Sequence, residues 1–126
     1  MTHAEARLQR EVVHELRSHG WLVLSIPNER ALGIADIKRM EAMGMTKGAP
    51  DLMAWDLQNN PWWFELKTPR GKRSPEQICF EHTAAELGIG YRVVRHVHDV
   101  QDLTMESEYR LFNPIDVDGL AANYKG

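Results

Sequence analysis

Asp51, Glu65 and Lys67 have the types and spacing that suit chemistry on a phosphate ester. Two carboxylates brought together repel each other, and one of them would normally take up a proton. A divalent cation removes that repulsion, and an oxygen-only site is what Mg²⁺ or Mn²⁺ prefers. A lysine beside such an ion can hold or deprotonate a water and stabilise developing negative charge. The three residues alone are explained equally well by a surface Glu-x-Lys pair and an aspartate in a turn.

Two strands would bring these side chains together. Residues 51–57 and 61–67 have strand composition, and 58–60 (Gln-Asn-Asn) form a turn, so the pattern predicts an antiparallel hairpin. Side chains alternate between the faces of a strand, which places Glu65 and Lys67 on one face with Trp63, and Trp62, Phe64 and Leu66 on the apolar face. The start of the first strand then lies beside the end of the second, where Asp51 and Glu65 converge.

Two further features favour a functional site. Gly48 and Pro50 constrain the backbone just before Asp51, and so help to position that side chain. Glu5 lies on a helical pattern at residues 4–19, in the middle of the apolar stripe of Leu8, Val12 and Leu16. A carboxylate on a buried face is costly unless it is paired or bound to metal, although one near a helix start can also reach solvent. Glu11 points away from the stripe and reads as a solvated acid.

The rest of the chain supplies a frame for the hairpin. The residue pattern predicts strands at 21–26 and 91–94, a short helix within 29–47 that closes at Gly44, and a turn at Pro27-Asn28. Ser74, Pro75 and Gln77 form a capping box that begins another helix, which Gly88 ends. A short helix near residues 97–103 and a loosely held remainder complete the chain. The order α-β-(α)-β-β-α-β predicts a mixed sheet with helices packed on it.

Composition indicates one globular domain. The chain is 43% hydrophobic and 26% charged, which fits a folded protein rather than a disordered one. No apolar run is long enough for a membrane helix, and no signal-peptide pattern is present. A single cysteine, Cys79, rules out an internal disulfide and a thiolate metal cage, so we expect a cytoplasmic protein. The histidine spacing is not typical of zinc sites, and no Gly-rich loop suggests a nucleotide cofactor.

The net charge of −3 at first argues against a nucleic-acid partner. Residues 99–126 hold six acids and two bases, a charge of −4, which leaves residues 1–98 at +1. A basic run follows the hairpin and, alone, could be a solvated loop. The best candidates for phosphate contacts are basic residues in this run and near the last strand: Arg70, Lys72, Arg73, Arg92 and Arg95.

Residues 4–96 resemble the virus-type replication-repair nuclease (VRR-NUC) domain, a branch of the PD-(D/E)xK nuclease superfamily. The motifs that carry the resemblance occur in the family's order: Pro27-Asn28, Lys47-Gly48-Ala49-Pro50-Asp51-Leu52, Glu65-Leu66-Lys67 and Ser74-Pro75-Glu76-Gln77. The resemblance implies an α/β fold with a restriction-endonuclease-like core (α-β-β-β-α-β), a mixed sheet flanked by helices. It places the nuclease domain at 1–98, with 99–126 as an acidic C-terminal extension of the same domain.

The family's pattern also implies roles for single residues. The implied metal ligands are Asp51, Glu65, the Leu66 carbonyl and, from the first helix, Glu5. Lys67 would serve the attacking water, and Gln77 would line the site, although the capping box alone explains Gln77.

The sequence therefore predicts a Mg²⁺- or Mn²⁺-dependent DNA endonuclease of bacterial or phage origin. By resemblance, it would act as a homodimer on branched DNA such as four-way junctions. A catalytically idle nucleic-acid-binding or assembly module with the same fold is the rival, against which the intact Asp51, Glu65 and Lys67 argue. A sequence-specific restriction enzyme is a weaker alternative, because the chain is too short for a separate recognition domain.

Overall fold

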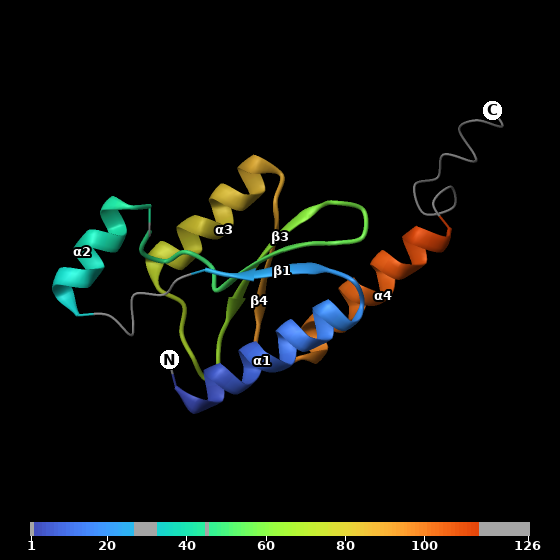
Figure 1. The fold of residues 1–126 in the computed structure, drawn as a ribbon, viewed down its shortest axis with the longest axis horizontal. Coiled ribbons are helices and arrows are strands. Elements are labelled where there is room, and N and C mark those ends of the chain that lie inside the picture. The colour runs from blue at the N-terminus through green and yellow to red at the C-terminus, as the bar shows by residue number, and fades with distance from the viewer. Residues whose placement is uncertain (1, 27–32, 45, 114–126) are drawn as a thin grey trace.

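The fold is a mixed four-stranded sheet with helices on its two faces (Figure 1). The computed structural model describes residues 2–26, 33–44 and 46–113. In chain order, its elements are α1 (His3–Ser18), β1 (Leu22–Ser25), α2 (Ile34–Ala42), β2 (Leu52–Trp55), β3 (Pro61–Leu66), α3 (Pro75–Leu87), β4 (Gly90–Val94) and α4 (His98–Phe112). The predicted α/β fold with a mixed sheet and flanking helices is confirmed.

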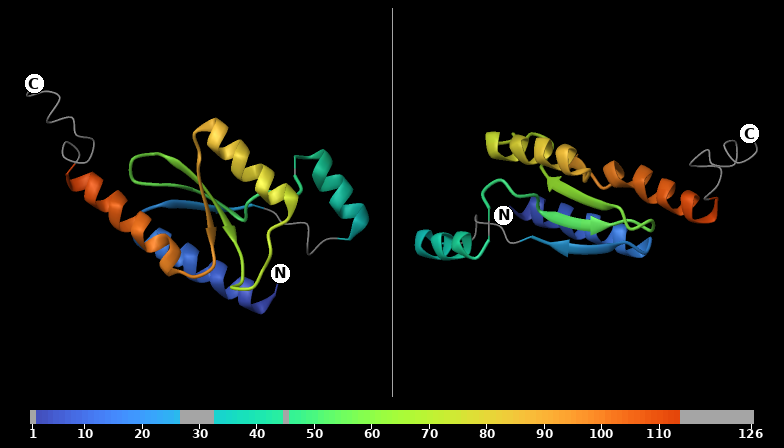
Figure 2. Two further views of the ribbon diagram at one scale, coloured as in Figure 1. Left: turned by 180° about the vertical axis from the view of Figure 1, so that it is seen from behind. Right: turned by 90° about the horizontal axis from the view of Figure 1, so that it is seen from above.

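The strands lie in the order β1-β2-β3-β4, as they occur in the chain. β2 and β3 form the predicted antiparallel hairpin, and β1 adds to β2, also antiparallel. β4 runs parallel to β3, because α3 carries the chain back across the sheet between them. Figure 1 shows α3 on one side of the sheet and α1 with α4 on the other, and the two views of Figure 2 show α2 at the periphery.

The hydrophobic core lies between the sheet and the two helices α1 and α4. The predicted stripe of α1, formed by Leu8, Val12 and Leu16, is buried. It packs with one face of the strands and with residues of α4; these partners are Val23, Leu52, Ala54, Phe64, Leu66, Val94, Val100 and Leu103. The alternation predicted for β3 is confirmed on this face, where Phe64 and Leu66 are core residues.

The sequence signals for the start and end of α3 are confirmed. Ser74 Oγ accepts the Gln77 N–H, and Gln77 Oε1 accepts the Ser74 N–H, which completes the capping box. Gly88 ends the helix with a φ of 71°, in the left-handed region that favours glycine.

The prediction for residues after 97 was wrong about length. Helix α4 continues to Phe112 instead of ending near Leu103, and it is an integral part of the core. Ser107 shows why: its side chain is buried, accepts the Leu57 N–H and donates to Gln58 Oε1. The helix is therefore held along its second half by polar contacts to the β2–β3 hairpin.

Two sequence predictions lie outside the described residues: the turn at Pro27-Asn28, and the loosely held end of the chain at residues 114–126. In the part of the chain that is described, no helix is both long and apolar enough to cross a membrane.

An ion pair between the end of α1 and α4 predicts that the stability of the fold depends on pH. His19, directly after α1, contacts Glu108 of α4 through Nδ1 and Glu15 through Nε2 at 3.2 Å. The hydrogen bond to Glu108 raises the pKa of His19 above its ordinary value, together with the charges of both carboxylates and against the opposing effect of burial. This stabilisation is fully present below about pH 6.5, the unfolded value, and is lost as pH rises through the raised folded-state pKa.

We therefore expect Glu108→Gln to lower the free energy of unfolding by about 0.5 kcal/mol at pH 6 and by much less at pH 9. Urea unfolding at several pH values measures this difference. Glu106→Gln, which removes an acid of the same helix that pairs with Arg110, is the matched control and should lack this pH dependence. Identical pH profiles for the wild type and Glu108→Gln would show that the contact contributes nothing.

Candidate functional site

The hairpin brings Asp51 to the end of β3, beside the backbone of Phe64 and Leu66. Leu52 pairs with Phe64 in the β2–β3 register, and Asp51 directly precedes this pair. The Asp51 N–H donates to the Phe64 carbonyl at 3.0 Å, and the Leu66 N–H donates to Asp51 Oδ2 at 2.7 Å. The carboxylate of Asp51 is therefore held at the end of β3 by the backbone of its neighbour.

The segment before Asp51 is fixed against the start of α3. Gly48 has a φ of 81°, and a Cβ at this position would lie 2.5 Å from Glu76 Cβ and 3.0 Å from the Gln77 nitrogen. Only glycine fits so close a contact at such a backbone angle. Pro50, which follows, is buried. The predicted constraint on the chain before Asp51 is present, and it ties Asp51 to α3 as well as to the sheet.

Glu65 is completely buried and is hydrogen bonded through both oxygens. Tyr91 of β4 donates to Oε1 at 2.6 Å, and Arg73 Nε donates to Oε2 at 3.0 Å. Burial and the hydrogen bond to Glu65 raise the pKa of Tyr91, so the phenol stays protonated and donates. The Glu65 carboxylate is thus held in a fixed orientation on the face of the sheet covered by α3.

Arg73 connects Glu65 to the surface of α3. Its Nη1 lies 2.8 Å from Glu81 Oε1, and its guanidinium carbon lies 5.7 Å from the centre of the Tyr91 ring. Burial lowers the pKa of Arg73. Its hydrogen bonds to Glu81 and Tyr91 and the charges of Glu65 and Glu81 outweigh burial, so the pKa is raised above its ordinary value. The Nη2 group of Arg73 is buried with no hydrogen-bond partner within the described structure.

Lys67 continues the face of Glu65 beyond the end of β3. The residue is 7% exposed, and its N–H donates to the Val94 carbonyl at 2.9 Å, which extends the pairing with β4. A Cβ at Gly71 would lie 3.4 Å from Lys67 Cδ, so the aliphatic part of Lys67 runs along the turn at 68–71. The Lys67 side chain is therefore buried at the end of β3, two residues after Glu65.

Gln77 and Glu5 are placed differently. The side chain of Gln77 is occupied by the capping box, and its backbone carbonyl accepts a long hydrogen bond of 3.4 Å from Tyr91. Glu5 lies in the first turn of α1 and is half-buried, whereas Glu11 is exposed, in the order that the helical pattern predicted. Among the described residues, no three Asp, Glu, His or Cys side chains are grouped to hold a metal ion, so Glu5 is not gathered with Asp51 and Glu65.

The predicted phosphate-binding residues divide into two groups. Arg70 and Lys72 are exposed on the loop that follows Lys67. The other three are engaged by protein: Arg73 as above, Arg92 with Asp102 and the Asp99 carbonyl, and Arg95 with the carbonyls of Thr68, Pro69 and Gly71. A role for Arg92 and Arg95 at DNA stays a prediction, and their visible role is to hold α4 and the loop after Lys67.

The donor set fits a hard divalent cation. Asp51, directly before β2, and Glu65, in β3, supply carboxylate oxygens, and the Leu66 N–H is hydrogen bonded to Asp51. Mg²⁺ commonly binds proteins through one or two carboxylates and keeps several waters, so a set without a third acid is compatible with it. Glu5 and the Leu66 carbonyl remain predicted additional ligands.

Sequence reasoning missed the partners of Glu65. Tyr91 was assigned only to a strand, and Arg73 only to phosphate contacts. Strand alternation could have indicated Tyr91, because β4 pairs in parallel with β3 and places Tyr91 beside Trp63 on the face of Glu65. No sequence pattern indicated that Arg73, in a loop, would contact Glu65.

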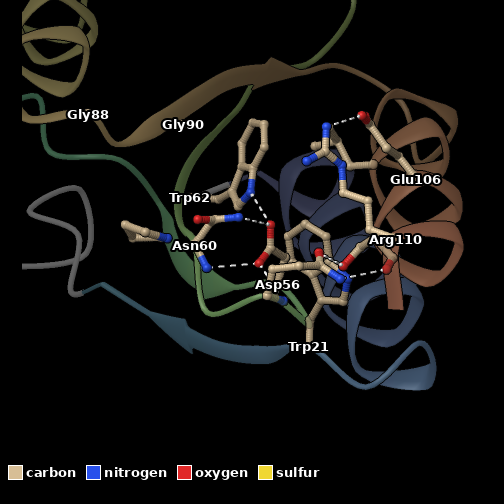
Figure 3. Close-up of a pocket in the computed structure, with 12 residues that line it drawn as sticks. Trp21, Asp56, Asn60, Trp62, Gly88, Gly90, Glu106 and Arg110 are labelled. Carbon is tan, nitrogen blue, oxygen red and sulfur yellow. Dashed lines mark hydrogen bonds and ion pairs between the residues drawn. The ribbon is translucent and has the colours of Figure 1, made fainter. Parts of the chain in front are cut away.

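A pocket at the opposite end of the hairpin is a weaker candidate for chemistry. It has a volume of about 280 Å³, and its walls include Trp21, Trp62 and Arg110. Figure 3 shows Asp56 accepting hydrogen bonds from Asn60 and Trp62, and Arg110 paired with Glu106. Its polar groups thus largely satisfy one another and stabilise the turn and the end of α4.

Comparisons with known proteins identify the fold. No family model and no curated protein matches the chain. Two solved structures are similar. One, a "VRR_NUC domain", has a TM-score of 0.61 and 23% sequence identity, and the match covers 81% of this chain and 95% of that chain. The other, a "VRR_NUC domain protein", has a TM-score of 0.63 and 15% sequence identity, and the match covers 85% of this chain and 89% of that chain. The predicted resemblance is confirmed at the level of structure, and the chain has the fold of VRR_NUC domains.

Proposed function

We propose that this protein is a metal-dependent DNA endonuclease that hydrolyses phosphodiester bonds. The observation that supports the proposal is the hydrogen bond from the Leu66 N–H to Asp51 Oδ2, which brings Asp51 to the end of β3, where Glu65 and Lys67 are both buried. The fold supports it, since both similar structures are named for a nuclease domain.

Each residue would have a defined task. Asp51 and Glu65 would hold Mg²⁺ or Mn²⁺, with the Leu66 carbonyl and Glu5 as further ligands. The bound ion would supply Lewis-acid chemistry and a more acidic water. Lys67 would orient the attacking water and stabilise the negative charge that develops on the phosphate in the transition state. Gln77 would line the site from the start of α3.

DNA would approach from the loop that follows Lys67. Arg70 and Lys72 are exposed there and can contact phosphates on either side of the scissile bond. Arg73, half-buried in the same loop, is within the site and adds a third positive charge. Arg92 and Arg95 would contribute mainly by holding the surrounding structure.

The preferred substrate would be branched DNA, with two copies of the chain acting together. This proposal rests on the resemblance to the VRR-NUC family and on symmetry, because a two-fold symmetric substrate such as a four-way junction suits a two-fold symmetric enzyme. The rival, an idle DNA-binding or assembly module, is disfavoured because Glu65 and Lys67 are both present and both buried at the site. Burying two charged side chains is costly for a domain that needs only a binding surface.

The central test is cleavage of labelled linear, flap and four-way-junction DNA with and without Mg²⁺ or Mn²⁺. We expect metal-dependent cleavage of the branched substrates, and we expect Asp51→Asn and Glu65→Gln to reduce it by orders of magnitude. Asp36→Asn, at an exposed acid of α2 that pairs with Arg39, is the control and should keep wild-type activity. Circular dichroism checks that the variants are folded. A wild type that binds these DNAs but never cuts them would favour the idle module.

For Lys67, the expected effect is on turnover. Lys67→Ala removes a charge that acts in the transition state, so the maximal rate should fall with little change in DNA affinity. Single-turnover cleavage and DNA titration measure the two quantities separately. Lys72→Ala, which removes an exposed positive charge of the same loop, should show the reverse. If Lys67→Ala instead bound DNA about tenfold more weakly at an unchanged maximal rate, Lys67 would be a phosphate clamp.

For α1, we expect Glu5 to matter and Glu11 to be silent. Glu5→Gln keeps shape and hydrogen bonding but removes the charge that would help to hold the ion or its water shell. Activity should therefore fall and be partly recovered at higher metal concentration. Glu11→Gln changes an exposed side chain and should have little effect. Metal-concentration dependence of cleavage distinguishes the two variants, and the opposite pattern would show that a different face of α1 approaches the site.

A further inference from the structure

The carboxylate of Glu65 already forms an ion pair with the guanidinium of Arg73. Arg73 Nε lies 3.0 Å from Glu65 Oε2, and the side chain of Glu65 is 1% exposed. Tyr91 takes the other oxygen at 2.6 Å. A buried carboxylate needs such partners, because an uncompensated charge in the protein interior is strongly unfavourable. Arg73 therefore does for Glu65 what a bound metal ion would do.

Arg73 has a second carboxylate within reach. Its Nη1 lies 2.8 Å from Glu81 Oε1, and the side chain of Glu81 is 47% exposed. Its Nη2 is buried and has no hydrogen-bond partner among the described residues. The guanidinium can thus give up Glu65 and keep Glu81, and it has a donor group available for an oxygen of another molecule.

On the basis of the proposed function, we propose that Arg73 is a positioning residue that exchanges with the metal ion at Glu65. Without metal, Arg73 neutralises Glu65 and holds the site in shape. A divalent cation on Glu65 would repel the guanidinium, which then turns to Glu81 and offers its free N–H groups to a DNA phosphate. Guanidinium groups suit phosphate oxygens because their donors match the geometry of the anion.

This exchange makes metal and DNA binding interdependent. Metal binding frees Arg73 for the phosphate, and a phosphate that binds Arg73 removes a competitor of the metal. By linkage, each ligand must strengthen the other by the same factor. Glu81 takes part without touching either ligand, because it receives the arginine that Glu65 releases.

The test is calorimetric titration of the whole protein with Mn²⁺ in the absence of DNA. We expect Arg73→Ala to bind Mn²⁺ about fivefold or more tightly than the wild type, within the usual range of coupling between sites. Glu81→Gln removes the carboxylate that receives Arg73, and should weaken Mn²⁺ binding by about threefold, the size expected of a partly exposed ion pair. Arg70→Ala removes a charge from the same loop away from Glu65, and should change affinity much less.

The opposite signs expected for Arg73→Ala and Glu81→Gln separate this exchange from a loss of folding, which would weaken binding in both. Equal or weaker Mn²⁺ binding by Arg73→Ala, or unchanged binding by Glu81→Gln, overturns the exchange. If the wild type binds Mn²⁺ and Asp51→Asn does not, the metal site of the proposed function stands whatever the result for Arg73. A wild type that binds no Mn²⁺ overturns both proposals.

Discussion

Burial of the Glu65 carboxylate is the constraint around which one whole face of the sheet is built. A charge withdrawn from water costs several kcal/mol unless polar partners replace the water. The partners come from two separate places, Tyr91 on β4 and Arg73 in the loop before α3. β4 runs parallel to β3, and the α3 crossover between the two strands brings Tyr91 into place. The same helix contacts Tyr91 through the carbonyl of Gln77.

The second carboxylate, Asp51, is held by a backbone N–H group. Asp51 accepts the Leu66 N–H, and the segment before it is pressed against the first turn of α3 at Gly48. The start of α3 therefore contacts the chain on both sides of the site, directly at residue 48 and through Tyr91 at the carbonyl of Gln77. A shift of α3 would therefore disturb the surroundings of both carboxylates.

Much of this arrangement could be predicted from sequence, because its signals are local. Strand alternation gave the two faces of β3, and Ser74 with Gln77 marked the start of α3. Long-range partners left no such signal: Arg92 and Arg95 have the composition of a phosphate-binding surface, yet they bind Asp102 and the backbone of the loop at 68–71. The second half of α4 was missed for a related reason, since polar contacts of Ser107 replace the apolar pattern that identifies a buried helix face.

The charge of the whole chain gives a misleading impression of the site. The net charge of −3 arises from acids at the C-terminal end, and those on α4 are engaged within the protein. Asp102 pairs with Arg92, Glu106 with Arg110, and Glu108 with His19, so much of their field is neutralised locally. Arg70 and Lys72 stay exposed beside Lys67. Since salt screens exposed charges beyond about 10 Å, an approaching phosphate responds to these nearby cations more than to the average of the chain.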